Sequence, residues 1–449
     1  MSASLSPNTA TLDAPTNQSS LTEWLDYMQQ IHVSAIDMGL SRVLPVAEYL
    51  GVVQSAKDDS YVFTVAGTNG KGSTTAVIAQ MCQAAGYKTA LYQSPHLSHF
   101  NERVRINGEM VSDETLIAAF SKVEEARLHC ELTLSFFEMT TLAALLIFAT
   151  ADCEVWVLEV GLGGRLDVVN IIDSDMAVIT NIGIDHVDWL GDNVEAIGAE
   201  KAGILRDDIT LIYGAAEMPD SVRQRITAHH VTCYQAGRDF SYCADDSETW
   251  QYSNAAVTLQ LPRPTLSLIN TANALSAVLA SPLKVDITAI KRALTTVKLA
   301  GRFDYRELAH RHWLFDVAHN EQGVNFLLTQ LMALWQQHSA QQENKTGTIK
   351  MLFSMLGDKD IELVVQRLSA ADLPISDWFV AEIDHPRAAT IEQLQSSLAD
   401  YVNLSQIHAL PDLQQATHAI INNSQAADLI VVCGSFHTIG EALAALDVE

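Results

Sequence analysis

One segment of the chain combines the residue types that bind a polyanion. The apolar run at 61–66 is followed by Gly67, a Thr-Asn pair, Gly70, Lys71, Gly72 and Ser73, and then by an apolar helical pattern. Glycines let backbone N–H groups approach an anion closely, the start of a helix adds a positive dipole, and a lysine can reach the outer phosphates. The order of strand, glycine turn and helix therefore predicts a site for a nucleoside triphosphate.

The spacing within this turn differs from the common phosphate-binding loop, G-x-x-x-x-G-K-[ST]. Only two residues separate Gly67 from the Gly-Lys pair, and Gly72 stands between Lys71 and Ser73. A plain glycine turn with a solvated lysine is the alternative. The coincidence of three glycines, a lysine and a hydroxyl cluster at one strand end favours the nucleotide site.

A second strand end offers an oxygen ligand for a metal ion. The apolar run at 155–160 delivers Glu159 to the carboxyl edge of the predicted sheet, where ligands bind in open α/β folds. A lone carboxylate near a phosphate loop suits a magnesium–nucleotide complex. The glycine-rich turn that follows, with Arg165 and Asp167, also fits a tight turn with a solvated charge pair.

Polar side chains follow other predicted strands. The run at 176–182 leads to Asp185, His186 and Asp188. His186 is a candidate metal ligand, although a lone histidine after a strand is more often structural. Composition alone favours an ordinary surface lysine at Lys201. Two later strand ends carry Asp316, His319, Asn320, Ser435 and His437. These also fit capped strand-to-helix turns.

Bulk properties exclude several classes of protein. The 449 residues carry a formal net charge of −27, which argues against binding to nucleic acids or anionic membranes. Six scattered cysteines without a C-x-x-C pair indicate a reducing compartment. The first 20 residues lack Lys, Arg and an apolar core, so they are no signal peptide. The longest apolar run, at 142–149, is far shorter than a membrane span. We expect a cytoplasmic monomer with small-molecule partners.

Strand and helix patterns alternate along the chain. The first series has strands at 61–66, 88–92, 155–160, 176–182 and 209–213, with helices at 74–86, 113–128 and 138–151. A small β-hairpin region is expected at 234–262. The second series has strands near 312–317, 349–355, 377–383 and 428–433, with helices at 321–338, 359–370, 390–401, 412–423 and 436–446. The alternation predicts an α/β protein: a P-loop ATPase-like parallel-sheet domain followed by a smaller Rossmann-like α/β domain. The expected parts are a flexible leader at 1–20, a nucleotide-binding domain at 21–297 and a C-terminal domain at 298–449.

Taken together, these motifs resemble the Mur ligase superfamily, and most closely its folylpolyglutamate synthase / dihydrofolate synthase branch. The resemblance runs from about residue 22 to the end and rests on motifs in family order. These are IDMGL (36–40), AGTNGKGS (66–73), YQSPHL (92–97), NERVRING (101–108), SFFEMTTL (135–142), LEVGLGGRLD (158–167), DHVDWLG (185–191), EKAGILR (200–206), GRF (301–303), FDVAHN (315–320), DKD (358–360) and CGSFHT (433–438).

The resemblance implies a chemistry. The family transfers the γ-phosphoryl group of ATP to a carboxylate, and the amine of L-glutamate then displaces phosphate from the acyl phosphate to leave an amide. Such a reaction needs metal ions, here two Mg²⁺, and a cradle that aligns the nucleophile with phosphorus. The implied activity joins L-glutamate to 7,8-dihydropteroate and extends reduced folates with γ-linked glutamates. A single-activity folylpolyglutamate synthase, or a Mur-type ligase with another acid, is the alternative.

The resemblance also implies roles for particular residues. The phosphates of ATP would lie on Asn69, Gly70, Lys71, Gly72 and Ser73, and the rest of the nucleotide on Asn270, Arg302, Asp316 and His319. The magnesium ligands would be Ser94, Glu159, His186 and Lys201. This superfamily carbamylates the lysine matched by Lys201, which would reverse its reading as a surface residue. Lys71, Lys201 and His186 are the catalytic candidates, and a monovalent cation is a further candidate.

Three segments would bind the pterin and folate. They are Asp37, Met38, Gly39 and Leu40; Ser135, Phe136, Phe137 and Glu138; and Leu166, Asp167 and Val168. Core packing explains the two phenylalanines almost as well as stacking on a heterocycle. Ser435 and His437 are candidates for the glutamate side. One departure is Glu321, where relatives often have a proline. Other classes stay open: a cell-wall precursor ligase, a P-loop ATPase that moves a partner, or an inactive folate-binding relative.

Overall fold

The computed structural model describes residues 14–32, 39–244, 248–340 and 347–447. The predicted folate residues Asp37 and Met38, and most of the predicted leader, lie outside these ranges. The chain forms two compact units. The first contains the residues up to Ser94 together with Asn101–Val297, and the second contains Pro95–Phe100 together with Lys298–Glu449.

The first unit is built on an eight-stranded sheet with the order β4-β3-β2-β5-β1-β6-β7-β8. Six neighbouring strands are parallel, and β3 and β4 run antiparallel at one edge. The strands are β1 (Tyr61–Ala66), β2 (Thr89–Tyr92), β3 (Val104–Ile106), β4 (Glu109–Met110), β5 (Val155–Glu159), β6 (Met176–Ile179), β7 (Thr210–Tyr213) and β8 (Thr232–Gln235). The central strands β2, β5 and β6 are buried at every residue, as expected for a parallel sheet covered on both faces.

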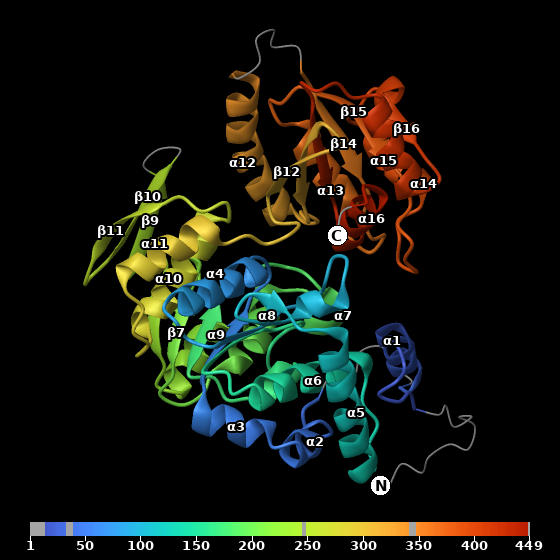
Figure 1. Cartoon of the computed structure of the whole chain (residues 1–449). Helices are drawn as coiled ribbons and strands as arrows, with labels where there is room; N and C mark the ends of the chain where they lie inside the picture. The colour runs from blue at the N-terminus through green and yellow to red at the C-terminus, as the bar shows by residue number, and fades with distance from the viewer. Residues whose placement is uncertain (1–13, 33–38, 245–247, 341–346, 448–449) are drawn as a thin grey trace. The chain divides into compact units, whose positions relative to one another are not determined.

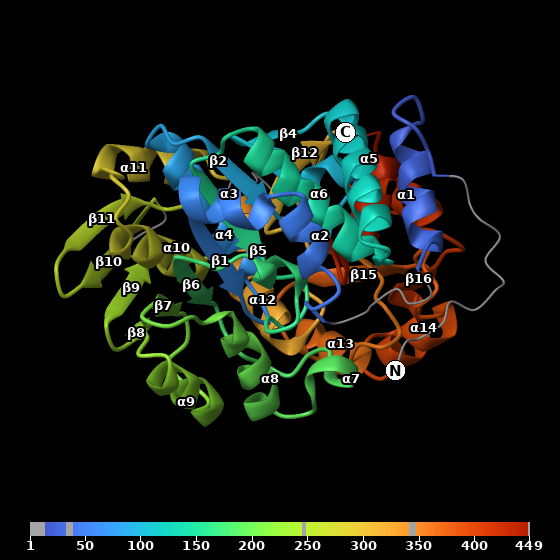
Figure 2. The ribbon, with the colours of Figure 1, turned by 90° about the horizontal axis from the view of Figure 1, so that it is seen from below.

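Helices of the first unit pack on this sheet and on one another (Figures 1 and 2). They are α1 (Leu21–Gln30), α2 (Leu44–Tyr49), α3 (Val52–Asp59), α4 (Lys71–Ala84), α5 (Asp113–His129), α6 (Phe136–Thr150), α7 (Val187–Leu190), α8 (Val194–Lys201), α9 (Asp220–Ala228), α10 (Leu268–Ala280) and α11 (Ile287–Thr296). Short 3-10 turns lie at Phe100–Arg103, Val168–Ile171 and Ala202–Ile204. Helix α10 lies beside α4, and α5 beside α6. No helix of the described ranges has the length and apolar character needed to cross a membrane.

The expected hairpin region at 234–262 is confirmed, and it holds three strands rather than two. Strands β9 (Phe240–Ala244), β10 (Thr249–Asn254) and β11 (Thr258–Pro262) form an antiparallel sheet. The β3–β4 hairpin was not predicted. Its turn contains Asn107 and Gly108, both at positive φ, and an Asn-Gly pair is a strong hairpin signal. The strands beside it are too short for an alternating pattern to stand out.

The second unit is a six-stranded sheet with the order β12-β13-β17-β14-β15-β16, in which only the edge strand β12 is antiparallel. Its strands are β12 (Asp304–Leu308), β13 (Arg311–Asp316), β14 (Ile349–Phe353), β15 (Ile375–Val380), β16 (Ile407–Ala409) and β17 (Leu429–Cys433). Its helices are α12 (Glu321–Ala340), α13 (Ile361–Ser369), α14 (Ile391–Ala399), α15 (Leu413–Asn422) and α16 (Phe436–Ala445), with a 3-10 turn at Leu404–Gln406. Two apolar clusters lie against the sheet. The predicted α/β class is confirmed in both units.

The described part of the predicted leader, residues 14–20, lies against α1. Trp24 Nε1 donates to Thr16 O at 3.1 Å, and Ser20 forms a capping box with Glu23. Because a capping box satisfies two otherwise orphaned N–H groups, Ser20 marks the start of the helix.

Candidate active site

The predicted phosphate loop lies between β1 and α4. Gly70 is in the left-handed conformation and occupies the N-cap position, so Lys71 opens the helix. A Cβ at Gly67 would overlap Thr180 Oγ1, and one at Gly70 would overlap the amide of Asn270 on α10. Both glycines are thus required by close approach as well as by backbone angle. The predicted nucleotide residue Asn270 therefore stands against the loop.

Two residues directly after β6 hold this loop by hydrogen bonds. Thr68 N donates to Asn181 O at 3.0 Å, and Asn69 N donates to Asn181 Oδ1 at 2.9 Å. Thr180 Oγ1 donates to Asn69 O at 2.6 Å. Neither Thr180 nor Asn181 was a predicted site residue, although both lie in the segment that precedes Asp185.

Two lysines share one carbonyl of the loop. Lys71 Nζ donates to Gly67 O at 3.0 Å, and Lys201 Nζ donates to the same oxygen at 2.9 Å. Lys201 is 4% exposed, so its reading as a surface lysine is wrong. Burial and the nearby charge of Lys71 lower the pKa of Lys201 to about 7, against the opposing effect of Asp185. A large share of Lys201 is therefore neutral near pH 7.

The predicted ligands Glu159 and Ser94 lie at neighbouring strand ends. Glu159 closes β5, is 4% exposed and pairs in register with Val65 of β1. Ser94 follows β2 by two residues and is half-buried. The residue between, Gln93, donates through Nε2 to Gly72 O at 2.8 Å and to Thr75 Oγ1 at 2.9 Å. Gln93 was not predicted as a site residue, and it joins the end of β2 to the phosphate loop helix.

His186 lines one small pocket with both lysines. The lining also includes Gly67, Thr68, the turn 160–163, Asp185 and Leu190. His186 has a φ of 54° at the N-cap of α7, an uncommon backbone for a non-glycine residue. Its Nε2 lies 3.9 Å from Asp185 Oδ2. The segment after β6 thus directs the imidazole to the phosphate loop.

This donor set fits Mg²⁺ held largely by phosphate and water. Among the described residues, no group of three or more His, Cys, Asp or Glu side chains could hold a metal. The predicted set contains two such residues, Glu159 and His186. Because Mg²⁺ usually keeps several waters and binds through one or two carboxylates plus substrate phosphates, so sparse a set is compatible with it.

At the start of α6, Glu138 is engaged by protein groups. Arg42 Nη1 and Nη2 donate to its two carboxylate oxygens at 2.7 and 2.6 Å, and Ser135 N donates to Oε2 at 2.6 Å. Glu138 is 1% exposed and forms a capping box with Ser135. In the structure, the predicted substrate-binding residues Ser135 and Glu138 thus stabilise the start of α6. Arg42 was not predicted, because its partner lies far away in the sequence.

Phe136 and Phe137 are both partly exposed beside this cap. A Cβ at Gly161 would meet the ring of Phe137, and Arg103 lies 6.0 Å from the ring centre of Phe136.

Asp167 accepts hydrogen bonds from Leu162 N at 2.8 Å and Val169 N at 3.0 Å, while Leu166 and Val168 flank it. Burial raises the pKa of Asp167 to about 6 despite these donors. In the first predicted segment, Gly39 and Leu40 are described and precede α2.

Replacing Arg42 with methionine is expected to lower the free energy of unfolding by about 2–4 kcal/mol, because it leaves the buried Glu138 carboxylate without its cation. Chemical denaturation followed by circular dichroism measures the change. Arg223→Met is the matched control, since Arg223 and Asp220 form an exposed pair at 3.7 Å, whose loss should cost less than about 1 kcal/mol. Equal effects of the two changes would contradict the importance of the buried pair.

In the second unit, Asp316 ends β13. Its oxygens accept from Phe303 N at 2.8 Å and Ala318 N at 2.9 Å, and burial raises its pKa. Arg302 lies over the ring of Phe436 at 4.9 Å, and the nearby Arg302 charge favours the Asp316 carboxylate. His319 Nδ1 bonds to Val317 O at 2.8 Å. These three predicted nucleotide residues gather at one end of β13.

Ser435 and His437 open α16. Ser435 is the N-cap, with its Oγ accepting from Thr438 N at 3.0 Å, which confirms the capping alternative for this serine. The ring of His437 lies 4.6 Å from that of His385, and Arg387 N donates to His385 Nδ1 at 3.1 Å. Burial, together with His385 and Arg387, lowers the pKa of His437. The predicted glutamate-side histidine thus stands in a cluster of nitrogen groups.

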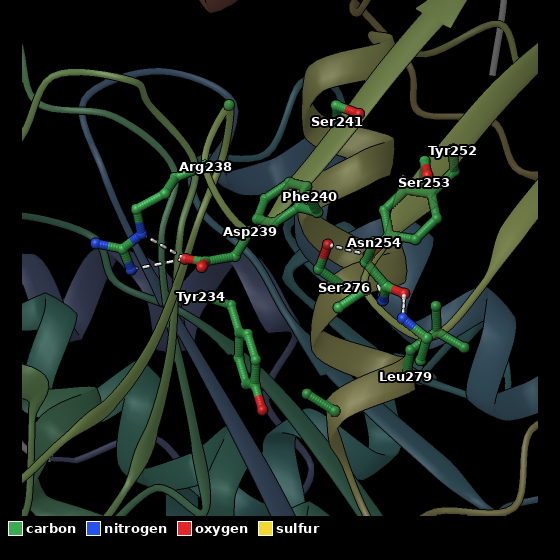
Figure 3. A pocket seen from close by; sticks show the side chains of 14 residues that line it. Tyr234, Arg238, Asp239, Phe240, Ser241, Tyr252, Ser253, Asn254, Ser276 and Leu279 are labelled. Carbon is green, nitrogen blue, oxygen red and sulfur yellow. Dashed lines mark hydrogen bonds and ion pairs between the residues drawn. The ribbon is translucent and has the colours of Figure 1, made fainter.

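A separate pocket of about 680 Å³ lies between α10 and strands β8 to β10 (Figure 3). Tyr234, Phe240 and Tyr252 line it. Tyr252 Oη bonds to Ser276 Oγ at 2.8 Å, and Arg238 Nη2 donates to Asp239 Oδ2 at 2.6 Å. Because these polar groups bond to one another, we assign no ligand to this pocket.

Two family models match the chain: the Mur ligase middle domain over residues 65–281, and the Mur ligase, glutamate ligase domain over residues 301–436. The fold and the site therefore define a ligase of the Mur class. The chain is 39% identical to the dihydrofolate synthase/folylpolyglutamate synthase of Escherichia coli (strain K12) over 97% of both chains. It belongs to the dihydrofolate synthase/folylpolyglutamate synthase family.

Solved structures agree. "E. coli FolC in complex with DHPP and ADP" is 38% identical, with a TM-score of 0.87 over 97% of this chain and 99% of that one. A bifunctional folylpolyglutamate synthase/dihydrofolate synthase "with Mn, AMPPNP and L-Glutamate bound" is 34% identical, with a TM-score of 0.86 over 97% of this chain and 100% of that one. The resemblance noted in the sequence is thus confirmed, as are the ligase class and the α/β fold.

Proposed function

We propose that this protein uses ATP to join L-glutamate to 7,8-dihydropteroate, and that it extends reduced folates with γ-linked glutamates. The observation that carries the proposal is the pocket in which Lys71, Lys201 and His186 meet the phosphate loop. The bound molecules named for the similar structures, DHPP, ADP, AMPPNP and L-glutamate, support the same substrates. We propose residues 21–297 as the ATP-binding domain and 298–449 as the glutamate-ligase domain.

In the first step, a carboxylate oxygen of the acceptor attacks the γ-phosphorus and the bond to ADP breaks, which leaves an acyl phosphate. The protein contributes position and charge rather than covalent chemistry. The N–H groups that begin α4 hold phosphate oxygens, and the Lys71 ammonium faces the outer ones. Glu159, His186 and Ser94 would hold magnesium, which would neutralise charge on the phosphates. The proposed nucleotide contacts are completed by Asn270, Arg302, Asp316 and His319.

In the second step, the glutamate amine attacks the acyl carbon, phosphate leaves and the amine loses a proton. We place the glutamate near Ser435 and His437. The Arg387 guanidinium, which also pairs with Asp358 at 3.1 Å, supplies a cation near His437 for a carboxylate. The acceptor would lie along Gly39–Leu40, the start of α6 and the segment 166–168. Asp37 and Met38 stay predictions.

We further propose that Lys201 carries a carbamate. A carbamate forms by attack of a neutral amine on carbon dioxide, with loss of a proton. The burial of Lys201 favours its neutral amine, and its position beside Lys71 would pair the new negative charge with a cation. The carbamate would also add a third metal ligand beside the Glu159 carboxylate and the His186 imidazole. A monovalent cation near the phosphates is a weaker candidate.

The six free cysteines support a reducing, cytoplasmic location. We also propose a monomer, which light scattering tests. The alternative to double activity is a single folylpolyglutamate synthase.

Product formation separates these possibilities. The purified protein is incubated with ATP, Mg²⁺ and L-glutamate, and either 7,8-dihydropteroate or tetrahydrofolate, and products are identified by mass spectrometry. We expect glutamate on both acceptors. Addition to one acceptor only would identify a single-activity enzyme. Addition to neither, with ATP still consumed when other acids are offered, would point to a different acid.

A further inference from the structure

Asn273 is a buried polar residue that the proposed mechanism does not use. It lies in the middle of α10 and is fully buried. Within the described part of the chain, neither its Nδ2 nor its Oδ1 has a hydrogen-bond partner. A buried amide without partners loses its hydrogen bonds to water and gains nothing in return. Such a group in a native fold indicates an ordered water or a neighbour that it serves.

The surroundings of Asn273 identify that neighbour. A Cβ added at Gly214 would overlap both Asn273 Nδ2 and Thr180 O, so the amide and this carbonyl crowd the same point. Gly214 itself follows β7, and its N–H donates to Ile179 O at 2.8 Å. One water, or a small movement of the amide, can therefore join Nδ2 to Thr180 O.

Thr180 is one of the two residues that shape the phosphate loop. Its hydroxyl donates to Asn69 O, and its neighbour Asn181 accepts from Thr68 N and Asn69 N. Asn270 lies one turn before Asn273 on α10, and side chains three residues apart share a helix face. One face of α10 thus lies against the phosphate loop at Gly70 and against Thr180, which holds the loop.

We infer that Asn273 is a positioning residue for ATP: its amide holds the Thr180 carbonyl, directly or through one ordered water, and so fixes the end of β6 that shapes the phosphate loop. The inference rests on ATP binding by this ligase and not on which acid is the acceptor. Asn273 touches no substrate in this role.

The test compares Asn273→Leu with Asn273→Ser. Leucine is close in volume but forms no hydrogen bonds. Serine leaves room for a water molecule that can join its hydroxyl to the Thr180 carbonyl. We expect Asn273→Leu to weaken ATP binding about tenfold, because a loop displaced by a fraction of an ångström presents its N–H groups poorly. Asn273→Ser should stay within about threefold of the wild type, since water-mediated hydrogen bonds are nearly as good as direct ones.

ATP binding is measured by calorimetry without acceptor, and KM values for glutamate and acceptor are measured separately. Ser276→Ala is the matched control: Ser276 is buried on the same helix but bonds to Tyr252, away from the loop (Figure 3). If Asn273→Leu does not fold, Asn273→Ala should show the same weakened ATP binding. The inference is overturned if ATP binding in the folded Leu or Ala variant is normal. It is also overturned if all three substrates weaken together, if Ser276→Ala has the same effect, or if Asn273→Ser is no better than Asn273→Leu.

Discussion

Lys71→Met is expected to lower turnover by about 10²–10³-fold, the usual cost of removing one preorganised group that stabilises a developing charge. Lys71 Nζ already lies in the loop, 3.0 Å from Gly67 O, so little reorganisation is needed when phosphate binds. Methionine keeps the aliphatic stem and loses only the charge. The rate of ADP release and the yield of glutamylated product measure the effect.

The control for this change is Lys57→Met on α3, an exposed lysine in the same unit. Its turnover should match the wild type. Both variants should unfold at the same denaturant concentration as the wild type within error. A Lys71→Met protein that turns over normally would remove this lysine from the mechanism, and with it the reading of 67–73 as the catalytic phosphate loop.

Lys201→Ala is the second large effect, with turnover expected to fall by about 10²–10³-fold. The loss follows from the carbamate proposal, because alanine provides no anionic ligand beside the loop. Formate or acetate in the buffer should then restore part of the activity by placing a free carboxylate in the vacated space. Carbon-13 NMR with labelled bicarbonate should give a carbamate signal in the wild type that is absent from Lys201→Ala.

Lys71→Met serves as the matched control for the rescue. It loses a charge in the same pocket, but a small carboxylic acid cannot replace a cation, so no rescue is expected. Full activity in Lys201→Ala would end the proposed role of this lysine. Loss of activity with neither rescue nor a carbamate signal would assign Lys201 a role as a cation bonded to Gly67 O.

Local patterns predicted every helix of the second unit and α4, α5 and α6 of the first, but not α1 to α3 or α7 to α11. Helix α12 was expected at 321–338 and spans Glu321–Ala340, and the strand expected at 61–66 is β1 itself. An apolar run bounded by turn residues is a property of neighbouring positions in the sequence, so such elements can be predicted without knowing the fold. The 3-residue strand β3 and the 2-residue strand β4 carry too few residues for such a pattern.

Burial was less predictable than secondary structure. Lys201 looked like a surface residue by composition and is among the most buried charged groups of the described chain. Glu138 was expected beside the substrate, and in the structure both its oxygens are held by Arg42, 96 residues away in the chain. Pairings of this kind depend on how the turn before α2 meets the start of α6, which no local pattern contains.

The sequence by itself determined the α/β class, the phosphate loop with Lys71, and, through its motifs, the ligase family. These depend on residues within a few positions of one another. Tertiary structure alone decided that Lys71 and Lys201 share Gly67 O, that Thr180 and Asn181 shape the loop, and that Asn273 stands buried behind them. The reason is physical: the pKa of an amine and the cost of a buried amide are set by neighbours in space, and separate strands supply those neighbours.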